Sequence, residues 1–120
     1  MKYRVEIPMK LPSLNEYIGV CRTNQYKAAK FKKDIEENIM VFLARLPRIE
    51  KPVKIHFLWI EESRRRDIDN ISGSKKFILD AMVKAGKLKD DNRRCVTAFT
   101  DDFDYAKEAK VILEIEEVEG

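Results

Sequence analysis

Residues 53–60 read Val-Lys-Ile-His-Phe-Leu-Trp-Ile, and this stretch shapes the expected architecture more than any other. Its inward-facing set would be every second residue, namely Val53, Ile55, Phe57 and Trp59. A period of two is typical of a β-strand with one buried face, and the further apolar residues between them favour a central strand. A charged segment over 61–70 follows. From Lys75 to Ala85 the apolar residues then fall on one helical face, and Gly86 stands where a left-handed helix cap is expected.

The rest of the chain adds one long helix and three strands. Residues 3–7 alternate as a half-buried strand, and Pro8, Pro12 and Ser13 predict a loop to about residue 23. Apolar residues then recur at steps of three and four from Asn24 to Leu46, where Pro47 ends the helix. Residues 94–100 and 109–116 predict two more strands. The order β-α-β-α-β-β predicts a single α+β domain over residues 1–120, with two helices packed on a mixed sheet. The pattern does not decide whether the helices share one face.

Composition narrows the class of partner. The chain has 120 residues, 44% hydrophobic and 38% charged, which suits one folded domain with an ionic surface. Residues 1–96 hold 22 Lys and Arg against 13 Asp and Glu, whereas residues 97–120 hold 2 against 8. A basic body suits a polyanionic ligand, although a salt-tolerant surface explains the charge equally well. No signal peptide or membrane-spanning run is found, and Cys21 and Cys95 lack metal-type spacing. We therefore expect a cytoplasmic protein with free thiols.

Carboxylates are the strongest chemical signal. Asp67 and Asp69 follow the central strand, and both would point the same way if the strand continued through them. A divalent cation such as Mg²⁺ would relieve their repulsion. Asp91, or its neighbour Asp90, could add a third ligand if its loop folded back over the sheet edge. Each of these pairs is also common in ordinary turns. A second acidic cluster is an alternative metal site, but its pattern is more typical of a solvated strand end or turn. It comprises Asp101, Asp102 and Asp104.

Cations lie next to the first carboxylate pair. Arginines 64–66 precede Asp67 and could hold phosphates around a scissile bond, and Lys75 or Lys76 could stabilise a phosphoryl-transfer transition state. Alternatively the arginines pair with Glu61 and Glu62, and the lysines only decorate a helix. His56, the single histidine, reads as structural. No glycine-rich phosphate loop is present, so we expect no nucleotide cofactor.

Taken together, several short motifs make the chain resemble the RusA-type Holliday junction resolvases. They are the segment from Arg64 to Asn70, Lys76, Leu79-Asp80-Ala81-Met82, Lys84-Ala85-Gly86 and Asp90-Asp91. The N-terminal stretch from Leu11 to Tyr17 is similar to that family's Pro-Ser-x-Asn-x-Tyr loop. The resemblance spans nearly the whole chain, with about three additional residues between Asn70 and the helix that carries the lysine. These additional residues leave Lys75 as an alternative to Lys76.

The resemblance implies a homodimeric, Mg²⁺-dependent endonuclease, with Mn²⁺ as a substitute, that acts in DNA recombination and repair and is often carried by phages and prophages. It places the metal on Asp67, Asp69 and Asp91, adds Lys76 as a catalytic residue, and leaves Asn70 to brace the site. The same resemblance implies paired symmetric nicks in a four-way junction that leave 5′-phosphates. The DNA-contacting residues that we predict are Arg64, Arg65, Arg66, Lys75, Lys76 and Asn15.

Two other functions fit the same residues. A nuclease that prefers flaps or other branched DNA would use the same site. A non-catalytic, structure-selective DNA-binding module would keep the acidic cluster for structure alone, and it would tolerate Asp69→Asn.

Overall fold

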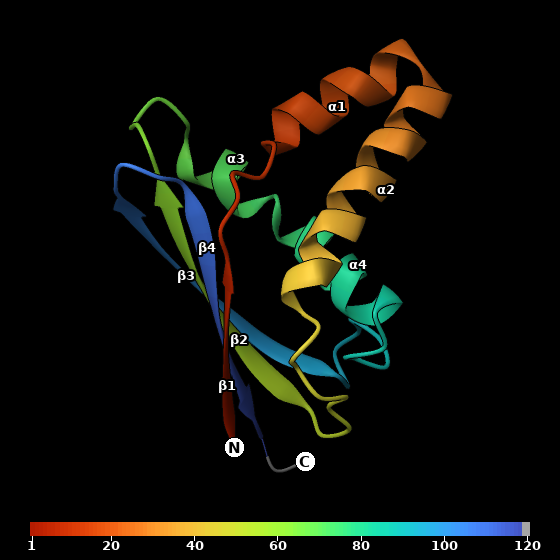
Figure 1. The fold of residues 1–120 in the computed structure, drawn as a ribbon, viewed down its shortest axis with the longest axis vertical. Coiled ribbons are helices and arrows are strands. Elements are labelled where there is room, and N and C mark those ends of the chain that lie inside the picture. Colours follow the sequence, from red (N-terminus) through yellow and green to blue (C-terminus); the bar gives the residue numbers. More distant parts are fainter. Residues whose placement is uncertain (119–120) are drawn as a thin grey trace.

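Four strands form one mixed sheet in the order β1-β4-β2-β3 in the computed structural model, which describes residues 1–118 (Figure 1). The strands are β1 (Lys2–Ile7), β2 (Val53–Glu61), β3 (Val96–Tyr105) and β4 (Lys110–Glu117). Strand β4 runs antiparallel to both β1 and β2, whereas β2 and β3 are parallel. Strand β2 is therefore paired on both sides, which confirms the prediction of a central strand.

The helices lie together on one face of this sheet (Figure 1). They are α1 (Leu14–Thr23), α2 (Gln25–Phe42), α3 (Ile68–Ser72) and α4 (Lys75–Lys84). The α+β class, the mixed sheet and the order of the strands are confirmed. The two predicted helices correspond to α2 and α4, whereas α1 and α3 were not predicted. Helices α3 and α4 form the crossover between the parallel strands β2 and β3, and Gly86 closes α4 with a φ of +74°, as the sequence predicts.

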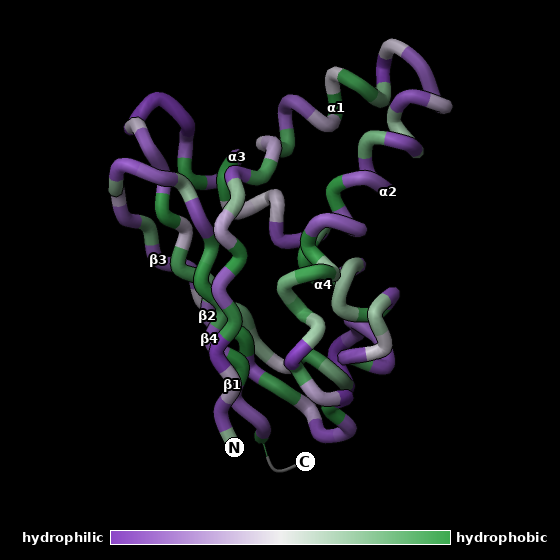
Figure 2. The backbone as a smooth tube through the Cα atoms, viewed as in Figure 1, coloured by the Kyte–Doolittle hydropathy of each residue, from purple (hydrophilic) through white to green (hydrophobic). Residues whose placement is uncertain are grey.

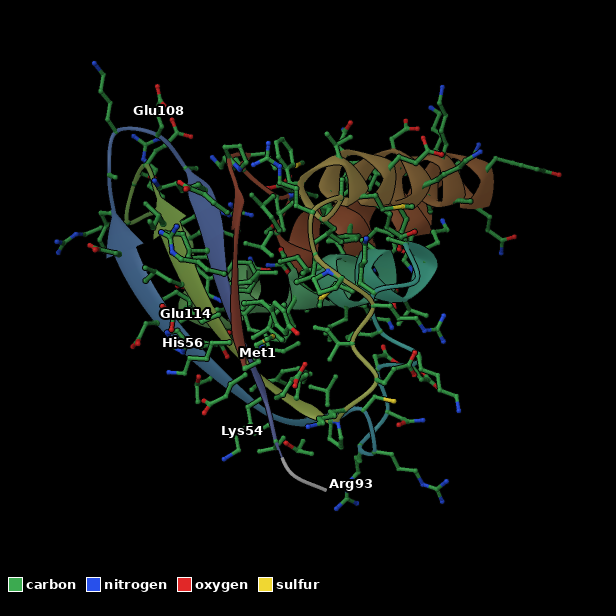
Figure 3. The ribbon with its side chains drawn as sticks, turned by 60° about the horizontal axis from the view of Figure 1, so that its bottom comes forward. Met1, Lys54, His56, Arg93, Glu108 and Glu114 are labelled. Carbon is green, nitrogen blue, oxygen red and sulfur yellow. The ribbon has the colours of Figure 1, made fainter. Side chains whose placement is uncertain are left out.

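Alternation along β2 builds the core. Its four predicted inward residues are at most 2% exposed, and they pack against apolar residues of α2 and α4 (Figure 2). Buried partners on the helices include Ile39 of α2 and Phe77, Ile78 and Met82 of α4. The opposite face of β2 carries Lys54 and His56, which point away from the helices beside Glu114 (Figure 3). The sheet thus buries one face, because only that face presents an uninterrupted set of apolar side chains.

Three local predictions differ from the structure. The loop expected to reach residue 23 contains α1, which starts at Leu14. Ser13 caps this helix by accepting a hydrogen bond from the Glu16 N–H at 3.2 Å. The spacing of Ser13 and Glu16 is that of a capping box, a signal that could have revealed the helix. Helix α2 ends at Phe42, four residues earlier than expected, and β3 continues to Tyr105 rather than to residue 100.

Smaller predictions can also be compared with the structure. Both cysteines are free thiols. Within residues 1–118 we find no helix of the length and apolar character that crossing a bilayer would require. The ring of His56 contacts Thr100 Oγ1 through Nδ1 and lies 3.2 Å from Asp102 Oδ2 through Nε2, which agrees with a structural role on the outer face of the sheet.

Candidate nuclease site

Asp67 and Asp69 lie in a helical turn rather than at the end of an extended strand. Strand β2 ends at Glu61, and Asp67 occupies the position before the first residue of α3, with φ −68° and ψ 146°. Its carboxylate makes no capping hydrogen bond, although aspartate commonly caps a helix there. Asp69 lies in the first turn, where one oxygen accepts the Asn70 N–H at 3.0 Å. Both side chains are exposed, so both carboxylates remain available to a ligand.

Asn70 joins this turn to the start of α1. Its Oδ1 accepts the backbone N–H of Asn15 at 2.9 Å, and Ser74 Oγ donates to the carbonyl of Pro12 at 2.5 Å. Gly73 allows the close approach, because a Cβ there would lie 2.9 Å from the Cβ of Leu14. The bracing role expected for Asn70 is therefore seen in the structure, while the Asn15 side chain remains exposed.

Arg66 is held inside the protein. Its Nη1 donates to Glu61 at 2.9 Å and its Nη2 donates to the Leu11 carbonyl at 3.0 Å, while Glu16 lies 3.7 Å away. The side chain is only 15% exposed. The alternative that arginine pairs with Glu61 is thus correct for Arg66. Its guanidinium clamps the residue before Asp67 to the end of β2 and is not free to hold a phosphate, contrary to our prediction.

The other two arginines remain open to solvent. The guanidinium of Arg64 lies 4.6 Å from the centre of the Tyr105 ring, a cation–π contact at the end of β3. Arg65 is exposed, and we find no carboxylate paired with its side chain within residues 1–118. Two adjacent cations are therefore presented beside the carboxylate turn.

Lys75 and Lys76 have different environments, although they are neighbours at the start of α4. Lys75 pairs with Asp101 at 2.6 Å and lies over the rings of Phe57 and Phe99, so its ammonium is engaged on the inner face of the sheet. Asp101 also accepts the Trp59 Nε1–H at 2.8 Å. This carboxylate is therefore a structural partner inside β3 rather than part of a solvated turn. Lys76 is 68% exposed and has only a longer, 3.4 Å contact with Asp80.

Asp91 lies at the opposite end of the sheet from Asp67. Parallel strands joined by a crossover enter the sheet at the same end, and the Val53 N–H indeed donates to the carbonyl of Cys95 at 2.9 Å. The nine residues of β2 separate its two ends by about 26 Å. The loop that carries Asp91 does not fold back over the sheet edge toward Asp67.

The same separation is visible from below. Arg93, two residues after Asp91, lies on the same side of this view as Lys54, where β2 begins, whereas Glu108 in the β3–β4 turn lies on the opposite side (Figure 3). Within the Asp pair, Asp90 uses its two oxygens to accept hydrogen bonds from the Asp91 N–H and the Asn92 side chain. Asp91 is thus the carboxylate of the pair that keeps its oxygens for another ligand.

A comparison with protein families shows to which family the chain belongs. The model of the endodeoxyribonuclease RusA matches residues 2–116. The chain belongs to the RusA family. It is accordingly an endodeoxyribonuclease of a family that resolves Holliday junctions. A search of curated proteins finds no match.

The donor chemistry of this RusA-family chain suits a hard divalent cation, because aspartate oxygens are the ligands that Mg²⁺ prefers. The arrangement within one copy does not complete such a site. Across residues 1–118 we find no group of three or more Asp, Glu, His or Cys side chains placed to hold one ion. Asp67 and Asp69 offer a pair of free carboxylates, and any third carboxylate must come from outside this local turn.

Proposed function

We propose that this RusA-family chain is a Mg²⁺-dependent endonuclease that resolves Holliday junctions by paired symmetric nicks, with Mn²⁺ able to replace Mg²⁺. The main support is the helical turn at Asp67 and Asp69, which follows the central strand. Both carboxylates are exposed, and that of Asp67 makes no capping hydrogen bond. Exposed cations flank that turn on both sides along the chain. Opposite charges at this spacing suit a phosphodiester held against a divalent ion.

Each neighbouring residue has a task in this proposal. Arg64 and Arg65 hold the phosphates on either side of the scissile bond, and their fork-shaped guanidiniums suit that contact. Lys76 points an ammonium from the start of α4 toward the leaving oxygen and offsets its developing charge. A divalent ion, when bound, polarises the phosphoryl oxygen and activates water. The side chain of Asn15 completes the proposed DNA-contacting surface, and Lys75, whose ammonium pairs with Asp101, is left out of it.

The third ligand, Asp91, comes from the partner copy in this proposal. A single chain separates Asp91 from Asp67 by the length of β2, so no small loop movement unites them. A two-fold dimer in which the β2 end of one copy faces the β3 entry of the other brings the carboxylates together twice. Two such sites match the two opposed strands of a four-way junction. Dimerisation would then be a requirement for metal binding as well as for paired cutting.

The biological setting follows from the substrate. Four-way junctions arise in DNA recombination and repair, which is where we place the enzyme, in the cytoplasm of a bacterium or of a cell that carries a prophage. Hydrolysis of a phosphodiester requires no nucleotide cofactor.

The first experiment compares substrates. The protein is incubated with a labelled four-way junction, a flap and a linear duplex of matching sequence, with Mg²⁺, with Mn²⁺ or with EDTA, beside Asp69→Asn. We expect symmetric nicks in the junction alone, lost with EDTA and with the variant. Preferred cutting of the flap would show that the flap, and not the junction, is the substrate. Junction binding without cutting under either metal would leave a DNA-binding module.

A mixing experiment tests the shared site. Asp69→Asn and Asp91→Asn are each expected to be inactive, but their heterodimer contains one site with all three aspartates if Asp91 acts across the interface. Co-expressed copies with different tags should therefore nick one strand. Asp67→Asn mixed with Asp69→Asn is the matched control, because neither heterodimer site would be complete. Absence of activity in both mixtures, with heterodimers present, would place all three ligands in one chain.

A further inference from the structure

Helices α1 and α2 form an arm that leaves the body of the protein. The two helices run out from the sheet side by side and meet at a turn far from it (Figure 1). No residue of α1 is buried, and the buried residues of α2 are confined to positions 28–39. Tyr17 holds the pair together, since it stacks on Phe31 and meets Phe77 edge-on. Burial raises the pKa of the Tyr17 hydroxyl above its ordinary value. The outer third of the arm, however, contributes nothing to the core.

The outer part of this arm carries charge of one sign. Residues 17–33 contain five basic residues and neither Asp nor Glu, although the whole chain carries a net charge of only +3. Hydrophilic residues dominate around the turn (Figure 2). Like charges gathered on a short projection repel one another, so the arrangement adds no stability to the isolated protein. A bound polyanion would offset this repulsion between the basic side chains.

Three of these cations have no internal partner. Lys32 pairs with Asp80 at 2.7 Å, and Lys33 approaches Glu37 at 3.9 Å. In contrast, the part of the chain from residue 1 to residue 118 places no carboxylate within ion-pair distance of Arg22, Lys27 or Lys30, all of which are exposed.

An aromatic ring accompanies these free cations. Tyr26 is 89% exposed, the most open of the large apolar side chains, and it lies in the first turn of α2. Asn24 fixes this turn by accepting the N–H groups of Tyr26 at 2.8 Å and Lys27 at 3.3 Å. Free cations around an exposed ring are typical of surfaces that bind nucleic acid, where the ring packs on sugar or base and the cations contact phosphate.

The arm has a fixed origin at the candidate nuclease site. Its base is tied to the carboxylate turn by the hydrogen bond from the Asn15 N–H to Asn70, and α1 then extends for ten residues. A helix of that length is about 15 Å long. Successive phosphates of one strand are about 3.4 Å apart along a duplex, so the tip lies about four to five base pairs beyond the turn.

We propose that the tip of the α1–α2 arm, formed by Arg22, Tyr26, Lys27 and Lys30, is a second DNA contact that grips the backbone of a duplex arm about four to five base pairs from the cut. The proposal rests on the proposed function for its substrate. It assigns the arm to affinity and to orientation of the duplex, and it leaves the chemistry with the aspartate turn.

The test measures junction binding against salt concentration in the Asp69→Asn background, which keeps the DNA intact. One variant adds Arg22→Gln, Lys27→Gln and Lys30→Gln. The matched control adds Lys2→Gln, Arg45→Gln and Lys107→Gln, three exposed basic residues outside the arm, and therefore changes the net charge equally. The arm variant should bind at least about tenfold more weakly and flatten the salt slope by about two to three for each bound copy, whereas the control should change the slope by less than about one. Circular dichroism verifies that both remain folded.

A second readout locates the contact. Methylphosphonate replacement of single phosphates about four to five nucleotides from the cut should weaken binding of the parent but not of the arm variant. Equal salt slopes for arm variant and control would overturn the proposal. Loss of dimerisation in the arm variant, with phosphate sensitivity unchanged, would also overturn it by making the arm a dimer surface. Failure of the Asp69→Asn parent to bind any junction would instead refute the proposed function.

Discussion

Arg66→Met tests whether this arginine clamps the loop or contacts DNA. The substitution keeps an unbranched side chain of similar length but removes the guanidinium that joins Glu61 to the Leu11 carbonyl. Glu61 would then remain as a carboxylate with a side chain only 9% exposed. The loss should therefore appear first in stability.

The expected magnitude follows from the two bonds. A hydrogen bond to a charged group contributes about 1.5–3 kcal/mol, and removal of one partner from a buried ion pair costs about 3–5 kcal/mol. Because the Arg66 side chain retains 15% exposure, water screens part of the interaction, and we expect the lower end, about 3 kcal/mol. Such a loss lowers the melting temperature of a domain this size by about 10 °C.

Urea unfolding at neutral pH measures the effect on Arg66→Met, on Glu61→Gln and on the double variant. In the double variant the buried carboxylate has become a neutral amide, so its loss should be smaller than the sum of the single losses by about 2 kcal/mol. Arg65→Gln is the matched control, since Arg65 is exposed, and it should change stability by less than about 0.5 kcal/mol. The same proteins are then titrated with a junction at increasing salt.

The reasoning would be refuted by one combination of results. Suppose that the unfolding free energy of Arg66→Met lies within about 0.5 kcal/mol of the parent value, and that the variant flattens the salt slope of junction binding by about 0.9. Arg66 then contacts a phosphate, and the internal clamp is wrong. We expect the opposite pattern, with the slope changed by Arg65→Gln instead.

Three further predictions concern the scaffold. Gly73→Ala places a Cβ 2.9 Å from the Cβ of Leu14, so the base of α1 must shift, and calorimetry should show a loss of about 1–3 kcal/mol. Gly86→Ala meets no neighbour, yet its φ of +74° should still cost about 1 kcal/mol in urea unfolding, and an unchanged midpoint would contradict the left-handed cap. The hydrogen bond from Lys32 to Asp80 raises the pKa of the Lys32 ammonium above 10.5, so this pair stabilises the fold below that pH and its contribution disappears as pH rises through the raised value. The unfolding free energy of the parent should therefore fall more steeply than that of Asp80→Asn as the pH rises above about 10.

The sequence was sufficient for the sheet and the core. Alternation along β2 identified the four inward apolar residues of the central strand, because a strand with one buried face repeats with a period that local sequence reveals. The cap at Gly86 and the helix before it were predicted for a similar reason, since both depend on neighbouring residues alone. The residue types that bind a divalent ion were also recognisable without coordinates.

Local pattern was less informative for α1. Prolines 8 and 12 suggested a longer loop, although Leu14, Tyr17, Ile18 and Cys21 recur at helical spacing. This spacing and the capping box were the signals that could have revealed the helix. The projecting arm, and with it the isolated positive charge of residues 17–33, became visible only in three dimensions.

Tertiary structure also decided which charges are free. Arg64, Arg65 and Arg66 are adjacent in sequence, yet only Arg66 reaches Glu61. Lys75 of α4 pairs with Asp101 of β3, while Lys76 faces solvent. Asp91 looks close to Asp69 along the chain, but the parallel crossover places them at opposite ends of β2. Sequence determined what these side chains can do chemically, because that depends on residue type. Their partners depend on strand direction and on packing between distant segments, and only the folded chain determines those.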